Sequence, residues 1–358
     1  MKKIQFTFNA FLLSSLGIAC GGYVSYQPML KKDYLRDMDK YPIKYGESGE
    51  TTNRETRQCN TFNYRFKKTG PDEKDRLYGE AYPIYIMQHH TVADFNRTVD
   101  IFTQGKSIVS AHYVIDTDGS IYCFVEDPYR ACHAGIGNLA ESSKLSSSLV
   151  SCSELQNDMN SWSIGIENVN NGNQPYTEEQ IKSNVALSEM LTQQNRNIDA
   201  KLMLGHSDWA PGRKIDPNPY FFWDKLANAQ DEPSLSELNI NKNFGVYPRK
   251  KDLSISTNPD IVVPYKEKDN RLSQDQQECI QKLREYGYDI KADGTYNDSV
   301  RRGILAFKIH HSGDDILRND DAREDWEKIY HGKEGSRLYQ FDANDGKYLD
   351  DLLDQFSK

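Results

Sequence analysis

The sequence predicts an α/β domain followed by a small all-helical unit. Within residues 81–232, short apolar runs typical of buried strands alternate with segments of helical periodicity. Within residues 272–356, the apolar residues recur at helical spacing. A chain of 358 residues is long enough for one sizeable domain and a smaller second one. Residues 233–271, which are mixed polar with scattered prolines, are predicted to link the two.

The N-terminus predicts export. Two lysines precede an apolar run over residues 6–18, as in a signal peptide spanning residues 1–20. The run ends in Leu-Gly-Ile-Ala-Cys, which resembles a bacterial lipobox whose cysteine, here Cys20, carries a lipid anchor; Gly17 departs from that pattern. We therefore expect membrane attachment through Cys20, with a cleaved soluble signal peptide as the alternative. Gly21 resembles the residue that follows the cysteine in lipoproteins sent to the outer membrane, so we expect an outer-membrane protein facing the periplasm, or a soluble periplasmic or secreted one.

The charge and hydropathy of the chain exclude two classes of protein. A net charge of −9 leaves no basic excess to neutralise phosphates, which argues against a nucleic-acid partner. The sequence has no apolar run of about 18 residues or more, which excludes a multi-pass membrane protein.

The cysteines point to no metal or redox motif. Five remain if Cys20 is used, and they include no CxxC pair, so neither a zinc ribbon nor a thioredoxin-like motif is predicted. Export permits disulfides. Cys123 and Cys132 are close enough in sequence to bridge a short connection, and free, packed cysteines are an equally good interpretation.

The first half of the α/β domain is predicted to contain strands, a helix and a hairpin. Residues 21–80 are expected to form a tether and irregular lead-in, and the first strong strand lies at 82–88. Apolar residues on one face predict a helix at 95–103. Strand-like runs at 111–115 and 121–125 flank Asp-Thr-Asp-Gly, which lacks the later ligands of a calcium loop and therefore predicts a hairpin turn.

The second half returns to strands around one long helix. The Ser-rich residues 138–161 are predicted to be an insertion loop that could overhang a cleft, and a short strand follows at 163–167. A capping box at Thr177 opens a helix. A strand at 202–205 then leads straight into His206.

The helical unit has its own start signals. Ser273 opens a second capping box, followed by apolar residues at helical spacing. An Asp-Gly pair turns the chain, and Asn297 can cap a second helix. Further apolar faces continue to residue 356.

Two histidines and an aspartate lie where a metal site is commonly assembled. His89 and His206 each follow a predicted strand, and Asp216 lies in a proline-rich loop. Strand ends in an α/β sheet commonly carry sites. Two imidazoles, one carboxylate and an open fourth position are what a catalytic zinc needs, whereas a structural zinc takes four protein ligands. Histidines packed in the core are the alternative that these residues leave open.

Five motifs in order resemble one enzyme family. They are Gln88-His89-His90-Thr91, Ser110-Ala111-His112-Tyr113, Cys132-His133-Ala134-Gly135, Ser163-Ile164-Gly165-Ile166-Glu167-Asn168, and the run from Gly205-His206 to Asp216-Pro217. Together they resemble the zinc-dependent N-acetylmuramoyl-L-alanine amidases of the amidase-2 or peptidoglycan-recognition-protein type. The resemblance implies a mixed central β-sheet flanked by helices and a Zn²⁺ cofactor.

The resemblance also implies a role for individual residues. The implied metal ligands are His89, His206 and Asp216. The implied catalytic residues are Glu167 and Lys214, and the implied substrate contacts are His133, Ala134 and Gly135. His112 matches a residue that is expected to be structural or to support the site.

The chemistry of amide hydrolysis agrees with these roles. Zinc held by two imidazoles and a carboxylate keeps a net positive charge and lowers the pKa of a bound water from about 15.7 towards 7. Glu167 would take the proton of the water and deliver it to the leaving amine, and Lys214 would stabilise the oxyanion. The alternatives are a surface strand carboxylate for Glu167 and a solvated loop charge for Lys214.

Residues 272–356 resemble a three-helix peptidoglycan-binding module, through Leu283-Arg284-Glu285-Tyr286-Gly287-Tyr288, Asp293-Gly294 and Ala306-Phe307. The resemblance implies peptidoglycan or muropeptides as partners, in a layout similar to the outer-membrane lipoprotein amidases. A helical cap that only packs on the first domain is the alternative for this unit. For the whole chain the alternative is a non-catalytic peptidoglycan-binding protein. A metallopeptidase of another fold is disfavoured because the chain has no His-Glu-x-x-His helix.

Overall fold

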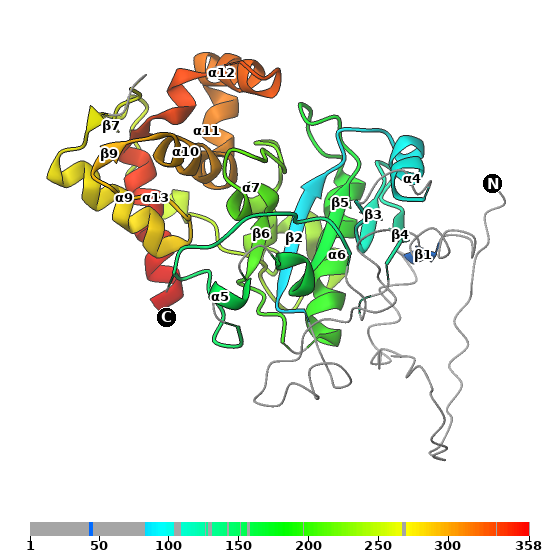
Figure 1. Cartoon of the computed structure of the whole chain (residues 1–358). Helices are drawn as coiled ribbons and strands as arrows, with labels where there is room; N and C mark the ends of the chain where they lie inside the picture. The colour runs from blue at the N-terminus through cyan, green and yellow to red at the C-terminus, as the bar shows by residue number, and fades with distance from the viewer. Residues whose placement is uncertain are drawn as a thin grey trace.

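The computed structural model describes residues 43–45, 83–103, 109–125, 127, 131–141, 143–150, 152–155, 158–195, 197–266, 270–333 and 335–357 (Figure 1). The predicted signal peptide, the predicted anchor Cys20 and most of the predicted tether lie outside these residues. Within them, no helix combines the length and the apolar character needed to cross a lipid bilayer.

A six-stranded mixed β-sheet forms the centre of the α/β domain, in the order β1-β4-β3-β5-β2-β6. Its strands are β1 (Ile43–Tyr45), β2 (Tyr85–His90), β3 (Tyr113–Ile115), β4 (Ile121–Cys123), β5 (Ser163–Asn168) and β6 (Met203–Gly205). All neighbours run parallel except β3 and β4. The predicted fold class, a mixed central sheet flanked by helices, is therefore confirmed. Strand β1 was not predicted, since it belongs to the segment expected to be an irregular lead-in.

The predicted hairpin joins β3 to β4. The Asp116 N–H donates to the Ser120 carbonyl oxygen and the Gly119 N–H donates to the Asp116 carbonyl oxygen, both at 2.9 Å. Gly119 has a φ of +76°, and a Cβ there would lie 2.9 Å from Ser183 Oγ. The Asp-Gly cluster is thus a turn that requires glycine for both its backbone conformation and its packing.

Helix α6 covers one face of the sheet (Figure 1). The helices of this domain are α4 (Phe95–Thr103), α5 (Cys152–Leu155), α6 (Glu178–Gln194), α7 (His206–Trp209) and α8 (Trp223–Ala227). The predicted capping box opens α6: the Thr177 side chain accepts from the Gln180 N–H, and the Gln180 side chain accepts from the Thr177 N–H. Val185 and Leu191 of α6 pack against Ile86 of β2 in one apolar cluster.

A buried amide network joins α6 to the ends of β2 and β5. The Gln88 and Asn184 side chains exchange hydrogen bonds at 2.8 and 3.1 Å. Asn184 Nδ2 also donates to Asn168 Oδ1 at 3.0 Å, and Asn168 Nδ2 donates to the His89 carbonyl oxygen at 3.1 Å. Because buried amides are costly unless they are bonded, this network fixes the strand ends where the predicted site residues lie.

On the opposite face of the sheet, Tyr85 and Met87 of β2 share one apolar cluster with described residues of the segment 138–161 and with the helical region. This segment was predicted to be an insertion loop that could overhang a cleft. Its described part is mostly irregular, and Leu139, Leu145 and Met159 are buried in the core. The Tyr85 hydroxyl donates to the Leu145 carbonyl oxygen at 3.0 Å. Serines interrupt the apolar residues of this segment, so their spacing predicts neither a helix nor a strand.

The C-terminal region is helical, as predicted. It contains α9 (Gln274–Tyr286), α10 (Asp298–His311), α11 (Gly313–Arg318), α12 (Asp320–Tyr330) and α13 (Ala343–Ser357), with two small sheets that pair β8 (Asn270–Arg271) with β9 (Thr295–Tyr296) and β7 (Ile261–Val263) with β10 (Phe341–Asp342). Ser273 forms the predicted capping box, and the Asn297 side chain accepts from the Val300 N–H. Figure 1 shows these helices gathered on one side of the central sheet.

Residues 233–271, expected to be a linker, pack closely where they are described. They include the 3₁₀ helices η2 (Pro233–Leu238) and η3 (Lys250–Asp252). Leu235 and Phe244 are buried in the cluster beneath α6. Arg249 forms an ion pair with Asp351 of α13, so this segment also ties the last helix to the rest of the chain.

The structure agrees with the prediction of free, packed cysteines at Cys123 but not at Cys132. Cys132 is disulfide-bonded, whereas Cys123 is a free, buried thiol. The predicted alternative of a disulfide between Cys123 and Cys132 is therefore wrong. Cys123 lies at the end of β4 in the apolar cluster that α6 covers, with Sγ 3.5 Å from the Val125 carbonyl oxygen. Proximity in sequence did not bring the two sulfurs together because the strand holds one of them in the core.

Candidate metal centre

The three predicted metal ligands converge at the carboxyl ends of β2 and β6. His89 Nδ1 lies 3.0 Å from His206 Nδ1 and 3.1 Å from Asp216 Oδ2. His206 Nδ1 lies 3.0 Å from the same oxygen. Nitrogen ligands about 2.0–2.1 Å from a tetrahedral zinc lie roughly 3.3 Å apart, so this spacing suits one shared ion. Within the described ranges, no second group of three His, Cys, Asp or Glu side chains is arranged in this way.

The far nitrogen of each imidazole is held by a neighbour. His206 Nε2 lies 2.8 Å from the Ala134 carbonyl oxygen, which can only accept, so His206 carries a proton on Nε2. His89 Nε2 lies 3.0 Å from His133 Nδ1. When His89 also carries its proton on Nε2, it can donate that proton to His133 Nδ1. Contacts of this kind fix the ring orientation and the tautomer of metal-binding histidines. They leave both Nδ1 atoms free to hold a cation.

The charge states in the cluster also suit a divalent cation. Burial, together with the neighbouring His206, lowers the pKa of His89 to about 4, so this imidazole is neutral near pH 7. Burial alone would raise the pKa of Asp216, but the charges and hydrogen bonds of His206 and His89 hold it well below its usual range. A neutral imidazole and an ionised carboxylate are the forms that bind zinc.

The loop that carries Asp216 is fixed at both of its sides. The Ser207 N–H of α7 donates to the Asp216 carbonyl oxygen at 2.8 Å. The Asn218 N–H donates to His90 Nδ1 at 3.2 Å, and the peptide bond between Asp216 and Pro217 is cis. His90 therefore supports the loop that brings the Asp216 carboxylate to the cluster.

Glu167 lies beside His89 on the same face of the sheet. The two residues are register partners in the parallel pair of β2 and β5, so their side chains project to one side. Among the described residues, Glu167 Oε2 is buried and has no hydrogen-bond partner. Burial, followed by the charge of Asp216, raises the pKa of Glu167 to about 8, against an opposing effect of Lys214. A buried carboxylate oxygen left without a partner is typical of a site that acts on a ligand.

In the metal-free protein, Glu167 is expected to make stability depend on pH. Its folded pKa of about 8 lies above the ordinary 4.5, so its contribution to folding is fully present below 4.5 and is lost as the pH rises through 8. Glu167→Gln removes this titration and should gain stability over the wild type, from near zero at about pH 4.5 to about 2–4 kcal/mol at about pH 9. Urea unfolding with chelator present measures the difference, and a gain that does not change with pH would contradict the raised pKa.

Arg213 and Lys214 approach the cluster from the loop before Asp216. Arg213 Nη2 donates to the Ala134 carbonyl oxygen at 2.7 Å, the same oxygen that holds His206. Gly135 has a φ of +60°, and a Cβ there would lie 3.2 Å from the Arg213 guanidinium. Lys214 is half-buried, and its charge lowers the pKa of both Glu167 and His89. Its positive charge therefore acts on groups of the cluster.

A groove of about 460 Å³ lies next to these residues. Its lining includes the exposed Ile136 together with Trp209 and Arg213, as well as Asp289 and Arg302 of the helical region. Both parts of the chain thus line this groove, which reaches Arg213 but none of the three clustered side chains.

A comparison with known families identifies this part of the chain. Residues 79–219 match the family model Amidase_2, described as N-acetylmuramoyl-L-alanine amidase. These residues are an Amidase_2 domain. The predicted family resemblance is confirmed, and the domain includes every residue predicted for the site.

Named relatives of the Amidase_2 domain are amidases. The chain is 33% identical over 121 residues to the 1,6-anhydro-N-acetylmuramyl-L-alanine amidase AmpD of Haemophilus influenzae, covering 34% of this chain and 58% of that protein. It is 27% identical over 251 residues to the N-acetylmuramoyl-L-alanine amidase AmiD of Escherichia coli, covering 64% of this chain and 76% of that protein. The chain therefore spans less than two thirds of the length of AmpD and about three quarters of AmiD.

Solved structures share the fold beyond the Amidase_2 domain. A complex of E. coli AmiD with anhydro-N-acetylmuramic acid-L-Ala-D-gamma-Glu-L-Lys matches with a TM-score of 0.51 at 22% identity, over 81% of this chain and 97% of that one. AmpDh3 from Pseudomonas aeruginosa matches with a TM-score of 0.51 at 20% identity, over 78% and 94%. Since 81% of the chain is more than residues 79–219, the common fold extends outside the family match.

The structure brings the predicted site residues together, while their individual roles stay predictions. His133 lies against the ring of His89, with the two ring centroids 5.1 Å apart. His112 is fully buried and accepts the Gly165 N–H at 2.9 Å. Arg213 was missed by the sequence analysis, although it stands in the quoted motif directly before Lys214.

Proposed function

We propose that this chain is a zinc-dependent N-acetylmuramoyl-L-alanine amidase that acts in cell-wall turnover or recycling. It hydrolyses the amide between N-acetylmuramic acid, in its ordinary or 1,6-anhydro form, and the L-Ala of the stem peptide. The cluster of His89, His206 and Asp216 beside Glu167, inside an Amidase_2 domain, is the observation that carries the proposal. The names of the relatives AmpD and AmiD support the same bond and the anhydro form of the sugar.

His89, His206 and Asp216 would hold the zinc through two Nδ1 atoms and one carboxylate oxygen. A bound zinc supplies Lewis acidity, which activates water and polarises the carbonyl group of the scissile amide. Three protein ligands leave a position open for this chemistry, as in other catalytic zinc sites.

Glu167 moves the proton in the proposed reaction. Its carboxylate takes a proton from the attacking water as the new C–O bond forms, and returns it to the nitrogen as the C–N bond breaks. The products are a free amine on L-Ala and a lactyl carboxylic acid on the sugar, which then releases its proton to water. Lys214 stabilises the oxyanion that forms between these two events, an effect worth about 2.7–4 kcal/mol for one good donor.

The segment His133, Ala134 and Gly135 has two proposed roles: it orients the metal ligands, and it contacts the substrate. His133 and the Ala134 carbonyl oxygen contact the two metal-binding imidazoles, so they orient His89 and His206. Gly135 is exposed where the segment reaches the groove beside Ile136, and there we place the substrate contact.

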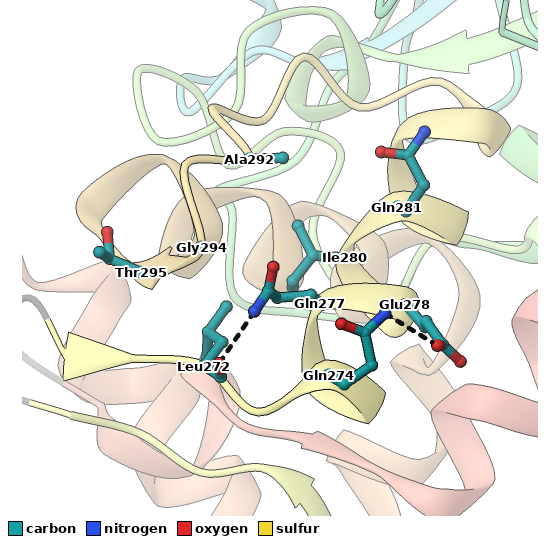
Figure 2. Close-up of a pocket in the computed structure, with 9 residues that line it drawn as sticks. All are labelled: Leu272, Gln274, Gln277, Glu278, Ile280, Gln281, Ala292, Gly294 and Thr295. Atoms are coloured by element: carbon teal, nitrogen blue, oxygen red, sulfur yellow. Dashed lines mark hydrogen bonds between the residues drawn. The ribbon is translucent and has the colours of Figure 1, made fainter.

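A small cavity in the helical region is our candidate for attachment to the cell wall. Its volume is about 260 Å³, and it lies between the first turns of α9 and residues 292–295 (Figure 2). Amide side chains are prominent in its lining, with Gln277 donating to the Leu272 carbonyl oxygen at 3.0 Å and Gln274 donating to Glu278 at 3.1 Å. Amides of this kind can exchange hydrogen bonds with the hydroxyl and acetamido groups of a glycan.

We also propose that a lipid on Cys20 attaches the protein to the outer membrane, facing the periplasm. The support for this attachment is the lipobox-like sequence alone. A chain that binds peptidoglycan without cutting it is the alternative, and the complete ligand set with Glu167 beside it favours the enzyme.

Mass spectrometry of purified muropeptides, incubated with the zinc-loaded protein, tests the proposed function. We expect two products, split at the muramic acid–L-Ala bond, whose masses add up to the mass of the substrate plus one water. A chelator should abolish these products, and added zinc should restore them. Cleavage within the stem peptide would overturn the proposed bond. Intact muropeptides after incubation with zinc-loaded protein would support the non-catalytic alternative.

A further inference from the structure

Asp208 is a fully buried carboxylate in the helix that carries the ligand His206. Helix α7 is a single turn that begins at His206, and Asp208 has no exposed surface. Asp208 Oδ2 accepts the Gly205 N–H at 2.6 Å, which closes this turn from within. A buried carboxylate needs further donors, since an unpaired charge in the interior is very costly.

Those further donors come from the helical region. The Tyr288 hydroxyl donates to Asp208 Oδ1 at 2.8 Å, and His310 Nδ1 lies 2.7 Å from Asp208 Oδ2. Among the described residues, His310 Nε2 has no hydrogen-bond partner, so the ring of His310 forms its hydrogen bond through Nδ1, to Asp208. His310 also stacks on Trp223 of α8, with ring centroids 3.8 Å apart.

The turn fixed by Asp208 holds two of the three proposed metal ligands. His206 is the first residue of α7, so the course of the turn sets the direction of its ring. The Ser207 N–H donates to the Asp216 carbonyl oxygen at 2.8 Å, which ties the second ligand to the same turn. A single helical turn is not stable by itself. Its geometry therefore depends on the groups that hold Asp208.

We propose that Tyr288 and His310 are positioning residues of the metal centre, so that the helical region is a structural part of the zinc site. They act through Asp208 on the turn that places His206 and Asp216, and neither touches the metal or the substrate. This inference rests on the proposed function for the identity of the metal, and it adds a role for the helical region that does not involve the cell wall.

The test measures zinc binding by the full-length chain in the absence of any muropeptide. Tyr288→Phe and His310→Leu are expected to weaken zinc affinity about tenfold, the lower end of the effect of outer ligand partners. Competition with a fluorescent zinc chelator measures the affinity. With Co²⁺ in place of zinc, both variants should shift the visible absorption bands, which report the ligand geometry. His310→Asn should recover most of the affinity, since its amide N–H₂ can reach the place of Nδ1.

Tyr296→Phe is the matched control. Tyr296 is a buried tyrosine of the same region, and its hydroxyl donates to the Tyr339 carbonyl oxygen at 2.7 Å. Its loss should lower the melting temperature as Tyr288→Phe does, while the zinc affinity and the Co²⁺ spectrum stay those of the wild type. If His310→Leu does not fold, Tyr288→Phe carries the test.

The outcomes separate this inference from the proposed function. Wild-type zinc affinity and an unchanged Co²⁺ spectrum in folded Tyr288→Phe would overturn the positioning role, whatever the activity. An equal loss of affinity in Tyr296→Phe would also overturn it, because the effect would then be general destabilisation. A wild-type chain that binds zinc but cleaves no muropeptide would overturn the proposed function and leave the inference standing.

Discussion

Glu167→Gln is expected to lower the turnover of muropeptides by at least about 100-fold while the protein keeps its zinc. Glutamine has nearly the same shape as glutamate, but it cannot take a proton from water. Glu167 is not one of the three clustered ligands, so the metal should stay bound. Turnover on purified muropeptides and metal analysis of the same samples measure the two quantities separately.

Glu189→Gln is the control for this substitution. Glu189 is a buried carboxylate of α6 and, like Glu167, has one oxygen without a partner among the described residues. It bonds to Gln193 and Asn241, away from the metal cluster. We expect full turnover in Glu189→Gln. Turnover near the wild-type rate in Glu167→Gln would remove Glu167 from the mechanism.

The cluster could be predicted from sequence because its members stand next to local signals. His89 lies at the end of β2, His206 directly follows β6, and each strand is a recognisable apolar run. Asp216 follows His206 within one short motif. Parallel strands end at the same edge of a sheet, so local signals far apart in the sequence converge in space. The capping residues Thr177 and Ser273 were predictable for the same reason, since each acts on its own helix.

Contacts between distant segments could not be predicted in this way. Tyr288 and His310 contact Asp208 across 80 and 102 residues, and nothing in the sequence around them marks them as partners of the turn that carries His206. The segment 138–161 was assigned to an overhanging loop because its apolar residues have no regular period. They are buried by the surface that the helical region presents to them, and a single sequence does not reveal that surface.

A chain that ends at residue 271 is expected to lose the folded Amidase_2 domain. Leu283 and Tyr286 share one core cluster with Met87 of the central sheet. The Leu145 N–H donates to the Tyr286 carbonyl oxygen at 3.1 Å, so backbone bonds also cross the junction. Leaving one Leu or Phe exposed costs about 1.5–3 kcal/mol, and a domain is stable by only about 5–15 kcal/mol. Losing several such contacts should therefore remove the near-UV circular dichroism and the cooperative unfolding transition.

Gln281→Ala in the full chain is the control that distinguishes packing from wall binding. Gln281 is an exposed residue that lines the cavity in the helical region. Its loss should weaken retention on purified cell wall while folding and the hydrolysis of soluble muropeptides stay unchanged. A truncated chain that folds and cleaves soluble muropeptides at the full rate would mean that the helical region is a separable binding unit. Unfolding of the truncated chain would mean instead that the cluster of His89, His206 and Asp216 depends on the helical region, because the turn that carries His206 is bonded to it through Asp208.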